Sequence, residues 1–291
     1  MSRRAIAAGT ILALWFAGIA ALAHRELFRG AGEELALAAQ RVAPDAEYYA
    51  VSAGDRQVGW ASSTIDTART AIVVRDILVA TRSEPPGSRL DVRVLATLSR
   101  GFRLRTFDVE VGDSAPTTLR GTLNSDSTLT LVTKTPGGRP DTTHTVAPGS
   151  LLLPTLVPIA LALRGRPRVG QTYAFSVFDP VARRPTTQSV AVRAESLFVV
   201  VDSAVLVTDR GRWTAAHVDT VRSWLLEPTG TDGALLRGWV DERGRVVDAG
   251  PVQSLTAHRT AYELAYENLR LENRAPGTPA TAPNAPVHPN R

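Results

Sequence analysis

The stretch YYAVSAGDRQVGWASS, Tyr48 to Ser63, holds two runs of alternating apolar and polar residues around Gly54-Asp55. Such runs joined by a two-residue Gly-Asp turn are typical of a β-hairpin. The pattern predicts two facing pairs on one surface of the hairpin: Val51 with Val58, and Tyr49 with Trp60. A phosphate-binding loop would need a helix directly after Gly54, whereas a strand pattern follows. We therefore expect a structural hairpin, with glycine present for its backbone angle.

The same alternation recurs along most of the chain. It occurs in segments 90–98, 107–111 and 129–131. Later strands are predicted at 172–178, 189–194, 197–201 and 213–226, and a pair of strands at 235–249. The last segment should bend at residues 241–244, where Gly244 can take the left-handed position of a turn. No helix of ten or more residues alternates with these strands, so a parallel sheet is not expected. Antiparallel strand order is predicted instead.

One apolar segment, SLLLPTLVPIALALRG from Ser150 to Gly165, breaks this alternation. Its apolar residues surround a short helix, predicted over 155–164, and such a helix must be buried. It is too short to cross a bilayer, so it should fill a curved sheet as a plug. The predicted fold class is mainly β: a curled antiparallel sheet, half-barrel-like, with a short buried plug helix and an N-terminal membrane helix before it. A second helix is expected near residues 261–272.

The N-terminus carries Arg3 and Arg4 before an uncharged run, Ala5–Ala23. A run of this length can cross a bilayer as a helix, and the arginines favour a cytoplasmic N-terminus. Residues 1–23 are therefore predicted to be a signal anchor or transmembrane helix, with the bulk of the chain exported. The alternative is a signal peptide cleaved after Ala23, since Ala-Leu-Ala fits the small-x-small rule. Both alternatives place the rest of the chain outside the cytoplasm.

The remaining chain divides into three parts. Residues 24–45 have apolar positions at intervals of three and four, which predict a juxtamembrane amphipathic helix ended by Pro44. Residues 46–273 form the predicted antiparallel β domain. Residues 274–291 are rich in proline and are expected to be a disordered tail.

Composition excludes several classes of function. The 291 residues include no cysteine, which excludes disulfides, cysteine nucleophiles and thiolate metal sites. The net charge is +5, and Lys134 is the single lysine, so arginine supplies nearly all the positive charge. These arginines are scattered among acidic residues rather than gathered in one patch, so nucleic acid is not an expected partner.

No catalytic, cofactor-binding or metal-binding residue is predicted, and no cofactor is expected. Asp108 with Glu110, and His217 with Asp219, lie two residues apart and share strand faces. Ordinary inside-outside alternation explains both pairs, and no G-x-S-x-G elbow or H-E-x-x-H motif accompanies them. Asp126 and Asp179 are interpreted as turn residues. The sequence therefore predicts that the chain is not an enzyme.

A resemblance to a known group of domains rests on the order of these segments. The YYAV hairpin ending in GW, the LLLPTLVPIALALRG plug, VGQTYAFSVFDP and WVDERGRVV together resemble an exported β-domain found upstream of bacterial transglutaminase-like domains. The outline is similar to the half-barrels of bacterial lipoprotein carriers. The resemblance covers residues 46–273 and implies an extracytoplasmic accessory domain. Together with the predicted N-terminal anchor, we expect a protein of the bacterial inner membrane with its bulk in the periplasm. No transglutaminase cysteine is present, so no catalytic residue is transferred.

Two functional classes follow. In the first, a non-catalytic, membrane-tethered extracytoplasmic β-domain acts as an envelope scaffold or protein-interaction module, held by residues 5–23 and bound to another envelope protein. In the second, the half-barrel carries a lipid or other apolar ligand. The candidate lining residues for the second are aromatic: Tyr49, Trp60, Trp224 and Trp239. Core packing is the alternative explanation for these side chains.

Overall fold

The computed structural model describes residues 31–272 except 82–88, 113–114, 181, 210, 231–234, 236 and 253. Its strands form one antiparallel 14-stranded sheet in the order β8-β7-β6-β5-β4-β3-β2-β1-β14-β13-β12-β11-β10-β9. The strands are β1 (Asp45–Ala53), β2 (Arg56–Thr67), β3 (Ala71–Thr81), β4 (Arg89–Ser99), β5 (Leu104–Val111), β6 (Thr117–Leu123), β7 (Thr128–Lys134), β8 (Asp141–Val146), β9 (Thr172–Asp179), β10 (Arg184–Val207), β11 (Arg212–Pro228), β12 (Gly238–Asp241), β13 (Val246–Val252) and β14 (Leu255–Thr260). The predicted mainly β, antiparallel class is confirmed.

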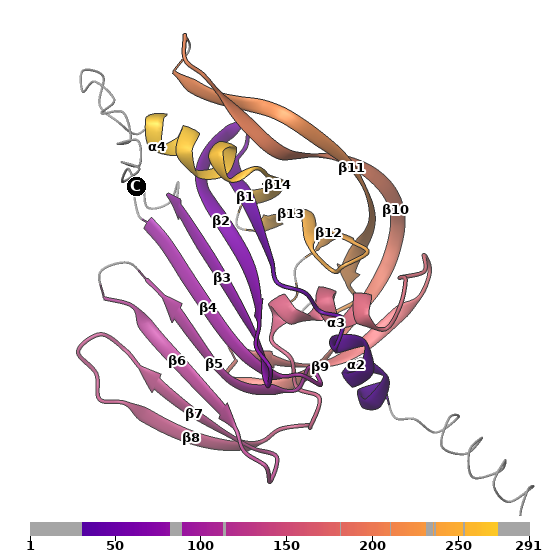
Figure 1. Ribbon diagram of the computed structural model, residues 1–291. Coiled ribbons are helices and arrows are strands. Elements are labelled where there is room, and N and C mark those ends of the chain that lie inside the picture. Colours follow the sequence, from indigo (N-terminus) through magenta and orange to yellow (C-terminus); the bar gives the residue numbers. More distant parts are fainter. Residues whose placement is uncertain are drawn as a thin grey trace, which may run out of the picture.

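Two meanders make up this sheet, one from β1 to β8 and one from β9 to β14. They join where β1 pairs with β14, from Tyr48 opposite Thr260 to Ala53 opposite Leu255. The sheet bends so that the two meanders face each other across the short helix α3 (Figure 1). Phe107 of β5 and Phe178 of β9 meet there with ring centroids 4.9 Å apart. The sheet is thus barrel-like, with apolar side chains of both meanders in one core.

The predicted plug lies where the sequence places it. A 3-10 turn, η1 (Pro154–Leu156), leads into the α-helix α3 (Val157–Leu163), with prolines in the first turns where they cost no hydrogen bond. Leu156 and Ala160 are fully buried, as an all-round apolar helix requires. The plug is also tied to the sheet, because the backbone N–H and C=O of Leu152 bond Ser176 and Phe178 on the outer edge of β9.

The first hairpin has the predicted turn but a different register. Gly54 has a φ of +59°, and Ala53 lies opposite Arg56 across the two-residue turn. A β-bulge then shifts the pairing by one residue, so that Val51 faces Gly59 and Tyr49 faces Ala61. The predicted facing pairs of Val51 with Val58 and Tyr49 with Trp60 are therefore wrong. A one-residue shift moves a side chain to the opposite face, so Trp60 does not share the face of Tyr49.

The second meander differs from expectation in one strand. The sequence predicts separate strands at 189–194 and 197–201, whereas both segments belong to the single 24-residue strand β10. No glycine or proline lies between Thr186 and Val207 to break the strand. Together with the 17-residue β11, it forms a long hairpin that arches over the top of the molecule (Figure 1). The predicted turn near Gly244 is present, with φ +76°.

Helices lie at both ends of the described chain. α2 (Ala31–Ala39) falls within the predicted helical region 24–45, and it buries Leu35 and Ala39. Near the C-terminus, a π-helical turn, η2 (Glu263–Glu267), continues into α4 (Asn268–Glu272). It lies on the face of β1 and β2 opposite the plug, where Tyr48 meets Tyr262 and Trp60 meets Tyr266.

The predicted membrane helix, residues 1–23, and the predicted tail, residues 274–291, lie outside the described residues. Within the part of the chain that the structure describes, no helix has the length and apolar character to cross a membrane.

Candidate functional site

The outer part of the β10–β11 hairpin is a two-stranded ribbon. β9 pairs with β10 only from Arg184 to Ala191, and β12 pairs with β11 only from Ser223 to Leu226. Beyond these points the two strands pair with each other, from Ser196 opposite Ser223 to Val207 opposite Arg212. We call residues 196–222 the distal hairpin. Figure 1 shows it projecting past the rest of the sheet.

Exposed apolar side chains gather on one face of the distal hairpin. Leu197 is 65% exposed, Val199 is 70% exposed and Val218 is 50% exposed. Leu197 and Val199 are two residues apart, and Val218 lies opposite Val201, so all three point to the same side. We call these three residues the ribbon face. Arg222, opposite Leu197, pairs with Glu195 at 3.4 Å and places charge at its border.

The far end of the distal hairpin contacts the helical segment formed by η2 and α4, which we call the C-terminal helix. The side-chain oxygen of Asn268 accepts a hydrogen bond from the backbone N–H of Trp213 at 2.9 Å, and its amide nitrogen donates to the carbonyl of the same residue at 3.0 Å. Asn268 thus satisfies the backbone groups of one residue as a neighbouring strand would. Because Asn268 is 9% exposed, this contact is shielded from water.

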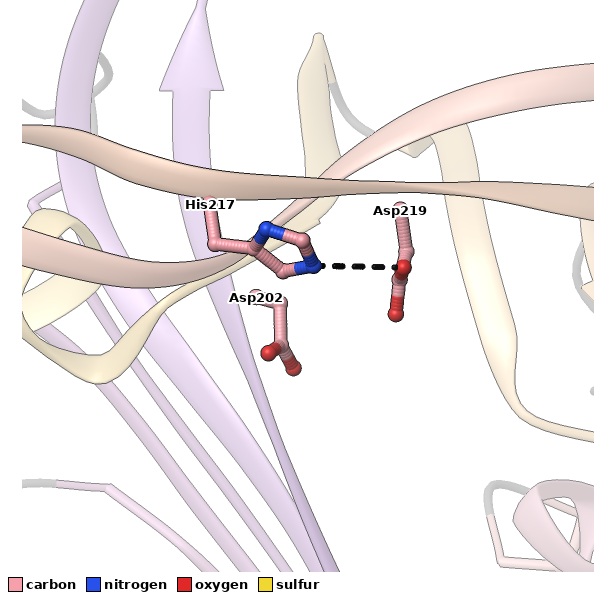
Figure 2. A group of neighbouring side chains, drawn as sticks. All are labelled: Asp202, His217 and Asp219. Atoms are coloured by element: carbon pink, nitrogen blue, oxygen red, sulfur yellow. Dashed lines mark ion pairs between the residues drawn. The ribbon is translucent and has the colours of Figure 1, made fainter.

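Three polar side chains gather on the opposite face of the distal hairpin. His217 and Asp219 share a face of β11, as predicted, with the imidazole Nε2 3.6 Å from a carboxylate oxygen of Asp219. The structure adds Asp202 from β10, which lies beside them at a bulge between Val201 and Ser203. Figure 2 shows the three side chains together, with the imidazole Nε2 facing the carboxylate of Asp219. Asp202 could not be predicted as the third group from the sequence, because it comes from another strand.

Two clefts flank the C-terminal helix. One, of about 610 Å³, lies between this helix, β14 and the end of the distal hairpin, and its lining includes Gln57, Arg212 and His258. The other, of about 450 Å³, lies on the β2–β3 side, and Trp60 and Leu269 are among its lining residues. Both lie on the face of the sheet that carries the C-terminal helix, rather than around the plug.

The four aromatic residues proposed as a ligand lining do not surround one cavity. Tyr49 and Trp224 are buried, at 6% and 2% exposure. Trp60 lies on the opposite face, in the smaller cleft against Tyr266. Trp239 packs against Phe198 of the hairpin, with ring centroids 5.0 Å apart. Core packing therefore accounts for Tyr49 and Trp224, and Trp60 alone among the four borders one of these clefts.

A buried ionic network, absent from the sequence predictions, ties β1 to the β12–β14 region. Arg245 donates to Asp45 at 2.9 Å. Arg259 donates to Asp241 at 2.8 Å and to Glu47 at 3.3 Å. Both guanidinium groups are almost fully buried, at 4% and 8% exposure of their side chains. The partners are separated by up to 212 residues in the chain, so no local sequence motif reveals them.

Burial changes the acid strength of several groups near this network. Desolvation raises the pKa of Glu47, against the opposing attraction of Arg259. Desolvation also raises the pKa of Asp76 on β3, although hydroxyl groups of Ser63 and Thr155 bond its carboxyl. Among the described residues, one carboxyl oxygen of Asp76 has no hydrogen-bond partner. The pKa of the Tyr49 hydroxyl is likewise raised by burial. Neither described cleft is lined by these three residues.

The other candidate acidic residues make local structural contacts. Asp108 pairs with Arg120 across the β5–β6 ladder at 2.5 Å. Asp126 accepts the backbone N–H of Thr128, and Asp179 accepts that of Ala182, each at 2.9 Å. These contacts match the interpretation of Asp126 and Asp179 as turn residues.

Comparison with protein-family models and with curated proteins found no match. Among solved structures, the chain is similar to the crystal structure of a β-barrel-like protein of domain of unknown function DUF1849 from Brucella abortus. The two share 13% sequence identity and a TM-score of 0.49, over 75% of this chain and 95% of the other. The resemblance to domains upstream of transglutaminase-like enzymes stays a prediction.

Proposed function

We propose that this chain is a non-catalytic protein-interaction module that binds another bacterial envelope protein through the ribbon face. Residues 5–23 tether it to the inner membrane in this proposal, with the β domain in the periplasm. The observation that carries it is the exposure of Leu197, Val199 and Val218 on one side of a two-stranded ribbon. Contiguous exposed apolar side chains bordered by charge are typical of protein-binding surfaces.

A binding role is supported by the contrast between the apolar side chains buried in the core and those exposed on the ribbon face. Core side chains fill the space around the plug, and Leu156, Ala160 and Val177 are fully buried there. The three ribbon-face residues contribute nothing comparable to that core, since half or more of each side chain is exposed. Burying them against a partner would remove apolar surface from water, at about 25 cal/mol per Å². In this proposal, the partner buries the ribbon-face side chains that the fold leaves exposed.

The test is site-specific photo-crosslinking of the full-length chain in its native cells. A photoreactive residue at Val199 should give a discrete heavier adduct, and Leu197→Lys or Val218→Lys should abolish that adduct. The matched control is a photoreactive residue at Val111, an apolar side chain 44% exposed on β5. Equal adducts at both positions, or none at Val199, would contradict the proposal.

Export and tethering need their own measurement. Protease added to spheroplasts should digest the β domain, while intact cells protect it. The fragment that stays in the membrane fraction should contain residues 5–23. Protection of the β domain in spheroplasts would contradict a periplasmic location.

A second candidate function is binding of an apolar molecule, favoured by the cleft of about 450 Å³ beside Trp60. Its lining combines Val58, Trp60, Val79 and Leu269 with Arg89 and Arg270, which suits an apolar body with an acidic head. Native mass spectrometry should then show an adduct that Trp60→Ala removes and Trp239→Ala retains. An adduct that survives Trp60→Ala would contradict this cleft as its site.

A further inference from the structure

We propose that Asp202, His217 and Asp219 form a binding site for a divalent metal ion of the zinc class. The three side chains come from two paired strands, and their ligand atoms all lie within 4.8 Å of one another. The His217 Nε2 and an Asp219 oxygen are 3.6 Å apart, close to the ~3.4 Å that separates two tetrahedral ligands around zinc. This site is independent of the proposed partner binding.

The backbone of the distal hairpin brings the third ligand to the other two. Val200 lies opposite Asp219, and Ser203 lies opposite His217, so the bulge inserts Asp202 between these pairs. Bulges commonly re-aim a side chain next to functional sites. In Figure 2 all three side chains extend from the ribbon toward the same space. Since each of the three side chains is exposed, close packing does not prevent it from turning toward an ion.

The charge of the site favours a divalent ion, and its ligand types favour a transition metal such as zinc. Two carboxylates bring two negative charges, and among the described residues no arginine or lysine forms an ion pair with either aspartate. A divalent ion would neutralise them. An imidazole nitrogen favours zinc and similar transition metals over calcium or magnesium, which prefer oxygen ligands. Three protein ligands leave at least one coordination position open to water or to a ligand from another molecule.

The test is zinc binding by the full-length chain without a histidine tag, measured by calorimetry. We expect one zinc ion per chain at this site, and at least about a tenfold loss of affinity for Asp202→Asn, His217→Asn and Asp219→Asn. The matched control is His258→Asn. His258 pairs with Asp248 at 2.9 Å on an exposed part of the sheet, but this pair belongs to no described three-ligand group. The His258→Asn substitution should leave the zinc affinity unchanged.

A second readout follows the imidazole directly. Zinc should shift the ring nitrogen resonances of His217 in NMR spectra of the wild-type chain, and Asp202→Asn should reduce that shift. Unchanged circular dichroism would confirm that the variants fold. The proposal is overturned if the wild-type chain binds zinc no better than His217→Asn, or if His258→Asn loses as much affinity as His217→Asn.

Discussion

The β10–β11 hairpin is buried at its base and carries exposed apolar side chains on one face farther out, although both parts are rich in apolar residues. At the base, Leu226 and Val192 are 4% and 0% exposed. Farther out, Leu197 and Val199 are 65% and 70% exposed. The difference arises because the plug lies at the base, whereas farther out only the face that carries Phe198 and Val200 is covered, and the ribbon face is not. An apolar residue in a strand therefore stabilises the fold only where another layer packs against it.

Ion pairs also differ between buried and exposed parts of the molecule, and removing a buried pair should cause the largest loss of stability. Arg259→Met would leave Asp241 and Glu47 buried without their partner, which should lower the free energy of unfolding by about 3–5 kcal/mol. The control is Arg222→Met, whose pair with Glu195 is roughly half exposed and should be worth about 0–1 kcal/mol. Urea titration followed by tryptophan fluorescence measures both. Similar losses of stability for the two variants would contradict the expected difference between the buried and the exposed ion pair.

The apolar side chains provide the second test. Leu226→Ala should lower the free energy of unfolding by about 2–5 kcal/mol, because it leaves a cavity beside the plug. Leu197→Ala, the same substitution in the distal hairpin, should change it by less than about 0.5 kcal/mol. The same urea titration applies. A large loss for Leu197→Ala would mean that the ribbon face is packed in the isolated chain.

A third test concerns a buried group that opposes folding. Desolvation raises the pKa of Asp76 above its unfolded value, so the folded state favours the protonated carboxyl. The associated stability is present below the unfolded pKa and is lost as pH rises through the folded pKa. One oxygen of Asp76 also lacks a hydrogen-bond partner within the part of the chain that the structure describes. Asp76→Asn should therefore stabilise the chain at neutral pH, by about 1–3 kcal/mol.

The pH dependence distinguishes this cause from a packing effect. The stability difference between Asp76→Asn and the wild-type chain should shrink as pH falls from 7 toward 3.8, the ordinary value for aspartate, where the wild-type carboxyl is protonated. Unfolding curves recorded along this pH series provide the measurement. A difference that does not change with pH would exclude ionisation of Asp76 as its origin.

The sequence predicts local features of the fold well. The Gly54 turn, the turn at Gly244 and the plug helix each depend on residues within one short segment, and each lies where expected. Glycine and proline restrict the backbone locally, and an apolar helix must be buried whatever its surroundings. These features are therefore visible in the sequence.

Features that depend on contacts between distant residues could not be predicted. The bulge between Val51 and Ser52 reverses the face of Trp60, and alternation alone gives no sign of it. Glu47 meets Arg259 across 212 positions, and Asp202 reaches His217 only through hairpin pairing. The ribbon face has the same pattern as a core strand, so exposure follows from topology rather than from local sequence.

The smallest expected effect concerns how the exposed end of the hairpin stays ordered. Asn268 satisfies both backbone groups of Trp213, and the two hydrogen bonds together contribute about 1–2 kcal/mol net. Asn268→Ala should therefore speed hydrogen exchange of distal-hairpin amides roughly tenfold, with little change at the base, where the core holds the strands. Asn124→Ala is the control, because its contact with Thr130 lies in the β6–β7 turn. Faster exchange at both ends would mean that Asn268 stabilises the whole sheet, and the hairpin would then open as one unit rather than from its tip.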